Sequence, residues 1–282
     1  MPKLRRISLV VVLISLSLVM VVCGQARRGG GMGAAGRGMQ PTDPPVLESA
    51  LLTGTLRFST DGVNMYLVVG QEKALLIDTG NPGNISPEQI KALTDLPLIV
   101  VNTHAHPDHS GSNNRFGKVY IHEADLEAGR QYSGGDVELV PIKEGYVFDL
   151  GGKTLEVIGV PGHTPGSICL LDAQDKLLFG GDTANEETWA FISDVPLETY
   201  KSSMERLLNW RDRYEVLLPG HGGTRPVSYI EELIACADEI LAGKVDPAAQ
   251  PATGGLTGGS LVHRYRSAAI RYNPNNLRAK ND

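Results

Sequence analysis

The most informative stretch of the sequence reads Thr103-His104-Ala105-His106-Pro107-Asp108-His109-Ser110-Gly111. It closely follows residues 98–101, a purely apolar run that predicts a strand buried on both faces. His104 and His106 are two positions apart in the extended segment after this run, so their side chains point the same way. The strand therefore ends by presenting two imidazoles side by side.

A corner of the chain follows these two histidines. Pro107 keeps His106 extended and can occupy the first position of a helix, which places Asp108 and His109 in the first helical turn. Imidazoles together with a carboxylate suit zinc, with iron or manganese as substitutes. This short segment therefore predicts a metal site at a strand end.

The other histidines fall into two groups. His163 and His221 lie, like the three above, in Gly/Pro-rich segments that follow apolar strands. Functional groups collect in such loops. His122 and His263 have no such setting, and we expect them to be structural or surface residues.

Short β-type runs and amphipathic runs are interspersed along the rest of the chain. We expect an α/β domain in which sheets pack between helices. The predicted strands are 51–58, 63–70 (with a turn at Asp61-Gly62), 73–77, 98–101, 118–121, 138–142, 154–160, 167–172, 176–179, 215–218 and 261–267. The predicted helices are one that begins at Ser86-Pro87 and those over 122–129, 197–212 and 227–242.

At this point a resemblance is evident. The stretch 103–111 resembles the signature of the metallo-β-lactamase-fold hydrolases, and further pieces appear in that family's order. They are Asp78 in 76–80, His163 in 161–167, Asp182 in 179–183 and His221 in 219–221. The likeness spans about residues 52–222.

The resemblance implies a single-domain αββα sandwich with its site along one edge of the sheets. It also implies two divalent metal ions, zinc before iron or manganese, and a set of roles. His104, His106 and His163 would hold the first ion, Asp108, His109 and His221 the second, Asp182 would bridge them, and Asp78 would orient a ligand by a hydrogen bond.

Two ions about 3.5–4 Å apart can hold a hydroxide between them and make it available at neutral pH. Asp108 is the candidate catalytic residue, which would orient this nucleophile and shuttle its proton. Ser110 has no evident base once the nearby histidines bind metal, so we do not expect a serine nucleophile.

The position of Asp182 indicates the substrate class. Glyoxalase II-like thioesterases and lactonases share this aspartate, whereas typical zinc β-lactamases carry Cys or Ser there. The tail after His221 supplies no clear basic clamp for glutathione. We expect hydrolysis of a small carbonyl ester, lactone or thioester. The alternatives are β-lactamase-type amide hydrolysis and a metal-dependent redox protein that handles oxygen, nitric oxide or persulfides.

Several aromatic and apolar side chains lie close to Asp182 in sequence. Trp189, Phe191 and Ile192 could line the substrate pocket or pack in the core. Tyr200 is expected to face the core from its helix.

The N-terminus has the features of a bacterial secretory signal, with basic residues at 3–6 and a Ser/apolar run at 7–22. That run is short for a membrane span. Cleavage after Ala26, lipidation at Cys23 and a retained anchor stay open, so membrane attachment stays open too. We therefore expect an exported protein, periplasmic or extracellular, with residues 1–26 as signal or anchor, 27–47 as linker, 48–243 as hydrolase domain and 244–282 as C-terminal extension.

The amino-acid composition limits the kinds of partner that we expect the protein to bind. The formal net charge of −6 gives no indication of nucleic-acid binding, which leaves a small-molecule substrate. Cys169 and Cys236 are expected to be two separate buried thiols rather than a disulfide.

Overall fold

The apolar run before the histidine motif is strand β5 (Leu98–Val101), which pairs in parallel with β4 (Ala74–Ile77) and β6 (Lys118–His122). Only its second half, Val100 and Val101, is fully buried. The predicted strand is therefore confirmed, but its burial on both faces is wrong at its first two residues. The chain enters the sheet there from a surface turn.

The computed structural model describes residues 46–49 and 54–279, and these lie in one compact unit, Thr42–Asp282. The predicted signal over 1–26 and nearly all of the predicted linker over 27–47 lie outside the described residues. In the described part, no helix is both long and apolar enough to cross a membrane.

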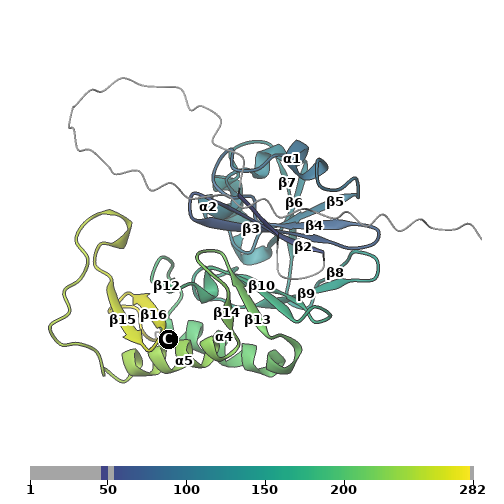
Figure 1. Cartoon of the computed structure of the whole chain (residues 1–282). Helices are drawn as coiled ribbons and strands as arrows, with labels where there is room; N and C mark the ends of the chain where they lie inside the picture. Colours follow the sequence, from purple (N-terminus) through teal and green to yellow (C-terminus); the bar gives the residue numbers. More distant parts are fainter. Residues whose placement is uncertain (1–45, 50–53, 280–282) are drawn as a thin grey trace, which may run out of the picture. The chain divides into compact units, whose positions relative to one another are not determined.

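Within these residues the first sheet has seven strands in chain order (Figure 1). Its first pairings are antiparallel up to β4, and those from β4 to β7 are parallel. Besides β4 to β6 it contains β1 (Val46–Ser49), β2 (Thr55–Thr60), β3 (Val63–Val69) and β7 (Glu138–Ile142).

The second sheet of the described chain has six strands in the order β14-β13-β11-β10-β9-β8. Only β11 and β13 pair in parallel; the other neighbours are antiparallel. The strands are β8 (Val147–Asp149), β9 (Thr154–Gly159), β10 (Ile168–Asp172), β11 (Leu177–Gly181), β13 (Val216–Pro219) and β14 (Arg225–Pro226).

Three apolar clusters show that the sheets and helices form four layers. The first lies between the sheets, where Ile77 of one sheet and Phe179 of the other are both fully buried. The second covers the outer face of the first sheet and includes Ile90 of α1 (Pro87–Lys91). The third covers the outer face of the second sheet and includes Tyr200 of α4 (Leu197–Leu207) and Ile230 of α5 (Ser228–Leu241). Figure 1 shows the same sequence of layers, and the predicted αββα sandwich is confirmed.

Helices and helical turns connect these strands. The α-helices are α1 (Pro87–Lys91), α2 (Pro107–Ser110), α3 (Leu126–Tyr132), α4 (Leu197–Leu207) and α5 (Ser228–Leu241). The 3-10 turns are η1 (Asn113–Arg115), η2 (Glu123–Asp125), η3 (Asp182–Ala184), η4 (Leu208–Arg213) and η5 (Gly255–Thr257). The predicted helix over 122–129 is thus a 3-10 turn followed by α3, and the one over 197–212 changes to 3-10 geometry after Leu207.

The C-terminal extension differs from its prediction. A single strand was expected over 261–267, but the chain makes a hairpin of β15 (Leu261–Tyr265) and β16 (Ala268–Tyr272). Arg266 takes a positive φ of 52° in the turn. The Arg-Ser pair is not a common hairpin turn sequence, which is why the pattern missed it. β16 also pairs in parallel with β12 (Glu187–Ala190), so the extension adds a small third sheet beside the metal-binding loops.

The short strands β1, β8, β12 and β14 were not predicted, because two to four residues carry too little periodicity. The hairpin turn at Asp61-Gly62 is confirmed, with φ of 54° and 80°. Cys169 and Cys236 are free and buried, as expected.

The two sheets are joined near the site by Asn64 of β3, which is almost fully buried. Its backbone N–H donates to the Gly220 carbonyl at 2.7 Å, and its side-chain amide donates to the Pro219 and Gly222 carbonyls at 3.0 and 2.9 Å. Tyr66 Oη donates to the same Pro219 carbonyl at 2.7 Å. The loop after β13 is therefore held from the opposite sheet.

We expect Asn64→Ala to lower the free energy of unfolding by about 1–3 kcal/mol, because it removes the two hydrogen bonds that the side-chain amide donates to the Pro219 and Gly222 carbonyls. Urea unfolding followed by circular dichroism measures the change. Tyr66→Phe is the matched comparison and should cost less, since Asn64 still donates to Pro219. An unchanged urea midpoint in Asn64→Ala would contradict this role.

Candidate metal centre

All seven predicted ligands come together, and each lies at or just after the carboxyl end of a strand. They form two groups, and within each group the possible ligand atoms lie within 4.8 Å of one another. The first group is His104, His106 and His163; the second is Asp108, His109, Asp182 and His221. His104 to His109 follow β5 in the first sheet, while the other three follow β9, β11 and β13 in the second. The site therefore lies across the edges of both sheets.

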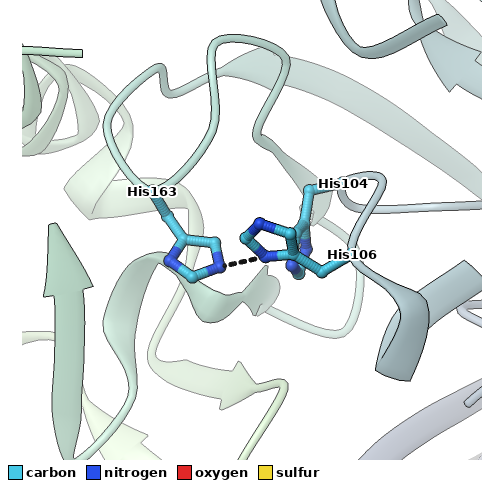
Figure 2. A group of neighbouring side chains, drawn as sticks. All are labelled: His104, His106 and His163. Atoms are coloured by element: carbon cyan, nitrogen blue, oxygen red, sulfur yellow. Dashed lines mark hydrogen bonds between the residues drawn. The ribbon is translucent and has the colours of Figure 1, made fainter. Parts of the chain in front are cut away.

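The three imidazoles of the first group face one another (Figure 2). His106 Nδ1 lies 2.8 Å from His163 Nε2, and the ring centroid of His104 lies 4.8 and 4.7 Å from those of His106 and His163. His104 Nε2 is buried and has no hydrogen-bond partner within the described chain. Three nitrogen atoms thus converge on one small volume.

The second group is built around the Asp182 carboxylate. Its Oδ1 lies 3.1 Å from His109 Nε2, and its Oδ2 lies 3.4 Å from His221 Nε2. The same Oδ2 is 3.5 Å from His163 Nε2 in the first group. Asp108 Oδ2 lies 3.2 Å from His221 Nε2. Asp182 is therefore within reach of both groups, as a bridging carboxylate must be.

Hydrogen bonds behind the rings turn their other nitrogens toward the site. His163 Nδ1 lies 2.7 Å from the Trp189 carbonyl, and His221 Nδ1 lies 2.8 Å from the Gly62 carbonyl. A carbonyl can only accept, so each Nδ1 carries a proton and each Nε2 is the ring nitrogen left to bind a metal. Such contacts fix the tautomer that a metal ligand needs.

The carboxylate of Asp78 makes contacts of the same kind with His109 and, through Thr103, with His104. Its Oδ2 accepts from His109 Nδ1 at 2.9 Å and from the Thr103 hydroxyl at 2.8 Å, and its Oδ1 accepts from the Thr103 backbone N–H at 2.7 Å. The Thr103 hydroxyl lies 3.1 Å from His104 Nδ1. Asp78 thus contacts His109 directly and reaches His104 through Thr103, and we propose that it orients these rings, the role that the resemblance implies.

Burial keeps the first group uncharged. Burial, reinforced by His109 and His163, holds the pKa of His104 well below its usual value. Burial and the neighbouring His163 lower the pKa of His106 to about 4, and burial also lowers the pKa of His163. Neutral imidazoles are the form that binds a metal.

In the second group, neighbouring carboxylates raise the pKa values of the histidines instead. Burial alone would lower the pKa of His221, but hydrogen bonds to Asp108 and Asp182 outweigh it and raise the pKa to about 10. Burial likewise opposes a charge on His109, and Asp182 and Asp78 outweigh it, so its pKa lies well above the usual value. A cation that binds here would displace these protons.

The donor set fits a pair of divalent metal ions. It consists of imidazole nitrogens and carboxylate oxygens, which zinc, iron and manganese accept. One of its buried atoms, His104 Nε2, lacks a hydrogen-bond partner in the described part of the chain. Buried polar atoms are normally paired, so this nitrogen is accounted for if it is a ligand.

A cavity of about 380 Å³ opens beside the second group. It is lined by Asp108, Asp182, Asn185, Glu186, Glu187, Trp189, His221 and Gly222. Of the three proposed pocket residues, only Trp189 lies here. Phe191 and Ile192 line a separate cavity with residues of the C-terminal extension. Tyr200 faces the core, as expected.

Asp125, which no sequence pattern singled out, ties the two loops of the first group together. Its carboxylate accepts from the Ala105 N–H at 3.0 Å, the Thr164 hydroxyl at 2.7 Å and the Gly166 N–H at 2.7 Å. A single acidic residue after a predicted strand carries no distinguishing pattern. His122 and His263 lie outside both groups, at the start of η2 and beside Glu239 respectively.

Gly220 leaves no room for a side chain beside the second group. A Cβ there would lie 2.4 Å from Asp182 Oδ1 and 2.7 Å from His109 Cε1. We expect Gly220→Ala to weaken metal binding by about tenfold or more, because it displaces these ligands. Metal content after dialysis against graded zinc buffers measures it. Gly223→Ala is the control, since nothing lies within 4 Å of that position; equal losses in both variants would contradict the steric argument.

Comparisons with known proteins bear on the same region. A family model described as "Metallo-beta-lactamase superfamily" matches residues 59–221. The acyl-coenzyme A thioesterase MBLAC2 of Gallus gallus is 34% identical over 209 residues, which are 58% of this chain and 75% of that protein. The atrochrysone carboxyl ACP thioesterase of Claviceps purpurea is 29% identical over 161 residues, 55% of this chain and 50% of that protein.

Solved structures agree on the fold. A metallo-beta-lactamase from Pontibacter korlensis has a TM-score of 0.56 and 22% identity, covering 67% of this chain and 97% of that one. At this identity the likeness shows the fold alone. Together the matches confirm the expected fold and the expected class of enzyme, a metal-dependent hydrolase. The chain belongs to the metallo-beta-lactamase superfamily.

Proposed function

We propose that this protein hydrolyses acyl thioesters with two divalent metal ions, zinc before iron or manganese. The observation that carries the proposal is that Asp182 lies within reach of both ligand groups, while the second group lines a cavity. Relatives named as acyl-coenzyme A and acyl-carrier-protein thioesterases favour the thioester over the ester or lactone.

The ligands would divide as the two groups divide. His104, His106 and His163 would hold one ion, Asp108, His109 and His221 the other, and Asp182 both. When bound, the ions would supply hydroxide from water at neutral pH and polarise the carbonyl of the substrate.

Asp108 is the residue that we propose to orient the nucleophile and take its proton. Its side chain lines the cavity and is about one-third exposed (35%), unlike the nearly buried Asp182. A partly exposed carboxylate can pass a proton on to solvent. Ser110 is fully buried, and its hydroxyl donates to the Ala105 and His106 carbonyls at 2.8 and 3.0 Å. Its geometry suits holding the ligand loop rather than attacking a substrate.

The direct test is a hydrolysis panel on the zinc-loaded protein, with and without chelator. The panel contains octanoyl-coenzyme A, a lactone, a simple ester, a chromogenic cephalosporin and a phosphodiester. Chelator-sensitive turnover of octanoyl-coenzyme A that exceeds the other four is the expected result. Preference for another substrate, with two ions bound, would overturn the thioester proposal.

Removing the shared carboxylate tests the metal assignment. Asp182→Ala should lose at least one ion per chain and reduce turnover by about a hundredfold or more, because both groups lose a ligand. Ser110→Ala is the control for a serine mechanism and should keep at least about a tenth of the activity. Metal analysis and initial rates measure both. Two retained ions with full activity in Asp182→Ala would refute the bridging role.

We also propose that the protein is exported, on the basis of residues 3–22. Expression of the full chain in a bacterial host, followed by fractionation and mass spectrometry of its N-terminus, tests this. An intact N-terminus in the cytoplasmic fraction would count against export.

A further inference from the structure

We propose that the side-chain amide of Asn185 donates a hydrogen bond to the substrate carbonyl oxygen as negative charge develops on it. This inference rests on the proposed hydrolysis of a carbonyl substrate. Asn185 belongs to the cavity lining beside Asp182 and His221, and only 6% of its surface is exposed. It comes directly after the turn η3 that carries Asp182.

The orientation of the amide is determined by a backbone group. The N–H of His221 donates to Asn185 Oδ1 at 3.0 Å. A backbone N–H requires an acceptor, so this branch of the amide is the oxygen and the other branch is the NH₂ group. The NH₂ group has no hydrogen-bond partner among the residues that the structure describes, nor is it among the fully buried unpaired atoms. It therefore has access to the cavity and hydrogen atoms available to donate.

The other side-chain donors of the cavity are already engaged. Trp189 Nε1 donates to Glu187 Oε1 at 3.3 Å, and His221 Nδ1 donates to the Gly62 carbonyl. His221 Nε2 faces Asp108 and Asp182 and is the nitrogen proposed to bind metal. The remaining polar side chains of the lining are carboxylates, which only accept when ionised.

Asn185 is also rigidly held before any substrate arrives. The backbone carbonyl of Asn185 accepts a hydrogen bond from Tyr229 Oη at 2.7 Å, and Tyr229 is almost fully buried. The preceding turn is fixed by Tyr200 Oη, which donates to the Thr183 carbonyl at 2.9 Å. A donor that needs no reorganisation is the kind that stabilises an oxyanion effectively.

Two substitutions separate donation to the substrate from support of His221. Asn185→Asp keeps an acceptor for the His221 N–H but removes the NH₂ donor, whereas Asn185→Leu removes both. If Asn185 donates to the oxyanion, kcat for octanoyl-coenzyme A falls about 10²–10³-fold in both variants, with KM little changed. Asn185→Asp should keep two ions per chain. Glu186→Gln calibrates what a change of one charge does in this cavity.

A second readout does not depend on turnover. Octylboronic acid forms a tetrahedral adduct that resembles the oxyanion, and Trp189 lines the cavity, so fluorescence of the zinc-loaded protein reports its binding. Both Asn185 variants should bind it more weakly than the wild type, and Glu186→Gln should be affected less.

The outcomes are distinct. An Asn185→Asp variant with wild-type kcat and wild-type boronate affinity would show that Asn185 only supports His221, and would overturn the inference. A loss of kcat and of boronate affinity in Asn185→Asp that is no larger than the loss in Glu186→Gln would also overturn the inference. If the wild type does not hydrolyse octanoyl-coenzyme A, the proposed function fails, and boronate binding still decides the role of Asn185.

Discussion

The buried carboxylate of Asp78 is the contact on which the site depends. Asp78 directly follows β4, takes a positive φ of 64° and receives three hydrogen bonds from Thr103 and His109, which come after β5. A non-glycine residue in this backbone region is strained, and an unpaired buried carboxylate would be costly. Here the three donors satisfy the carboxylate. Two neighbouring strands of the first sheet are thereby locked together at the point where the ligands begin.

The fold was predictable to a large extent because its layers leave simple patterns. The runs at 138–142, 154–160 and 167–172 are each strands within a residue of the expected bounds. The helix at 227–242 was visible from its apolar periodicity and is α5. Short strands without periodicity, such as β12, and the β15–β16 turn could not be read this way, because tertiary pairing rather than local preference forms them.

The residues of the site were likewise predictable only where a sequence motif marked them. The convergence of His104 and Asp182 was expected from the resemblance, because their motifs follow one another in the order of the family. Asn185 and Asp125 carried no such signal. What each does depends on contacts with residues 36 and 20 positions away, as in the bonds to His221 and Ala105. Spacing within a motif cannot reveal partners that only the folded sheets bring together.

The small third sheet has a consequence for the order in which the protein matures on the ribosome. β12 supplies the Trp189 carbonyl that accepts a hydrogen bond from His163 Nδ1, yet its partner strand β16 is synthesised only after both sheets, α4 and α5. Domains fold largely from the N-terminus during synthesis. A nascent chain can therefore form the sandwich while β12 still has an open edge, and the His163 side of the centre acquires its final support among the last steps of folding.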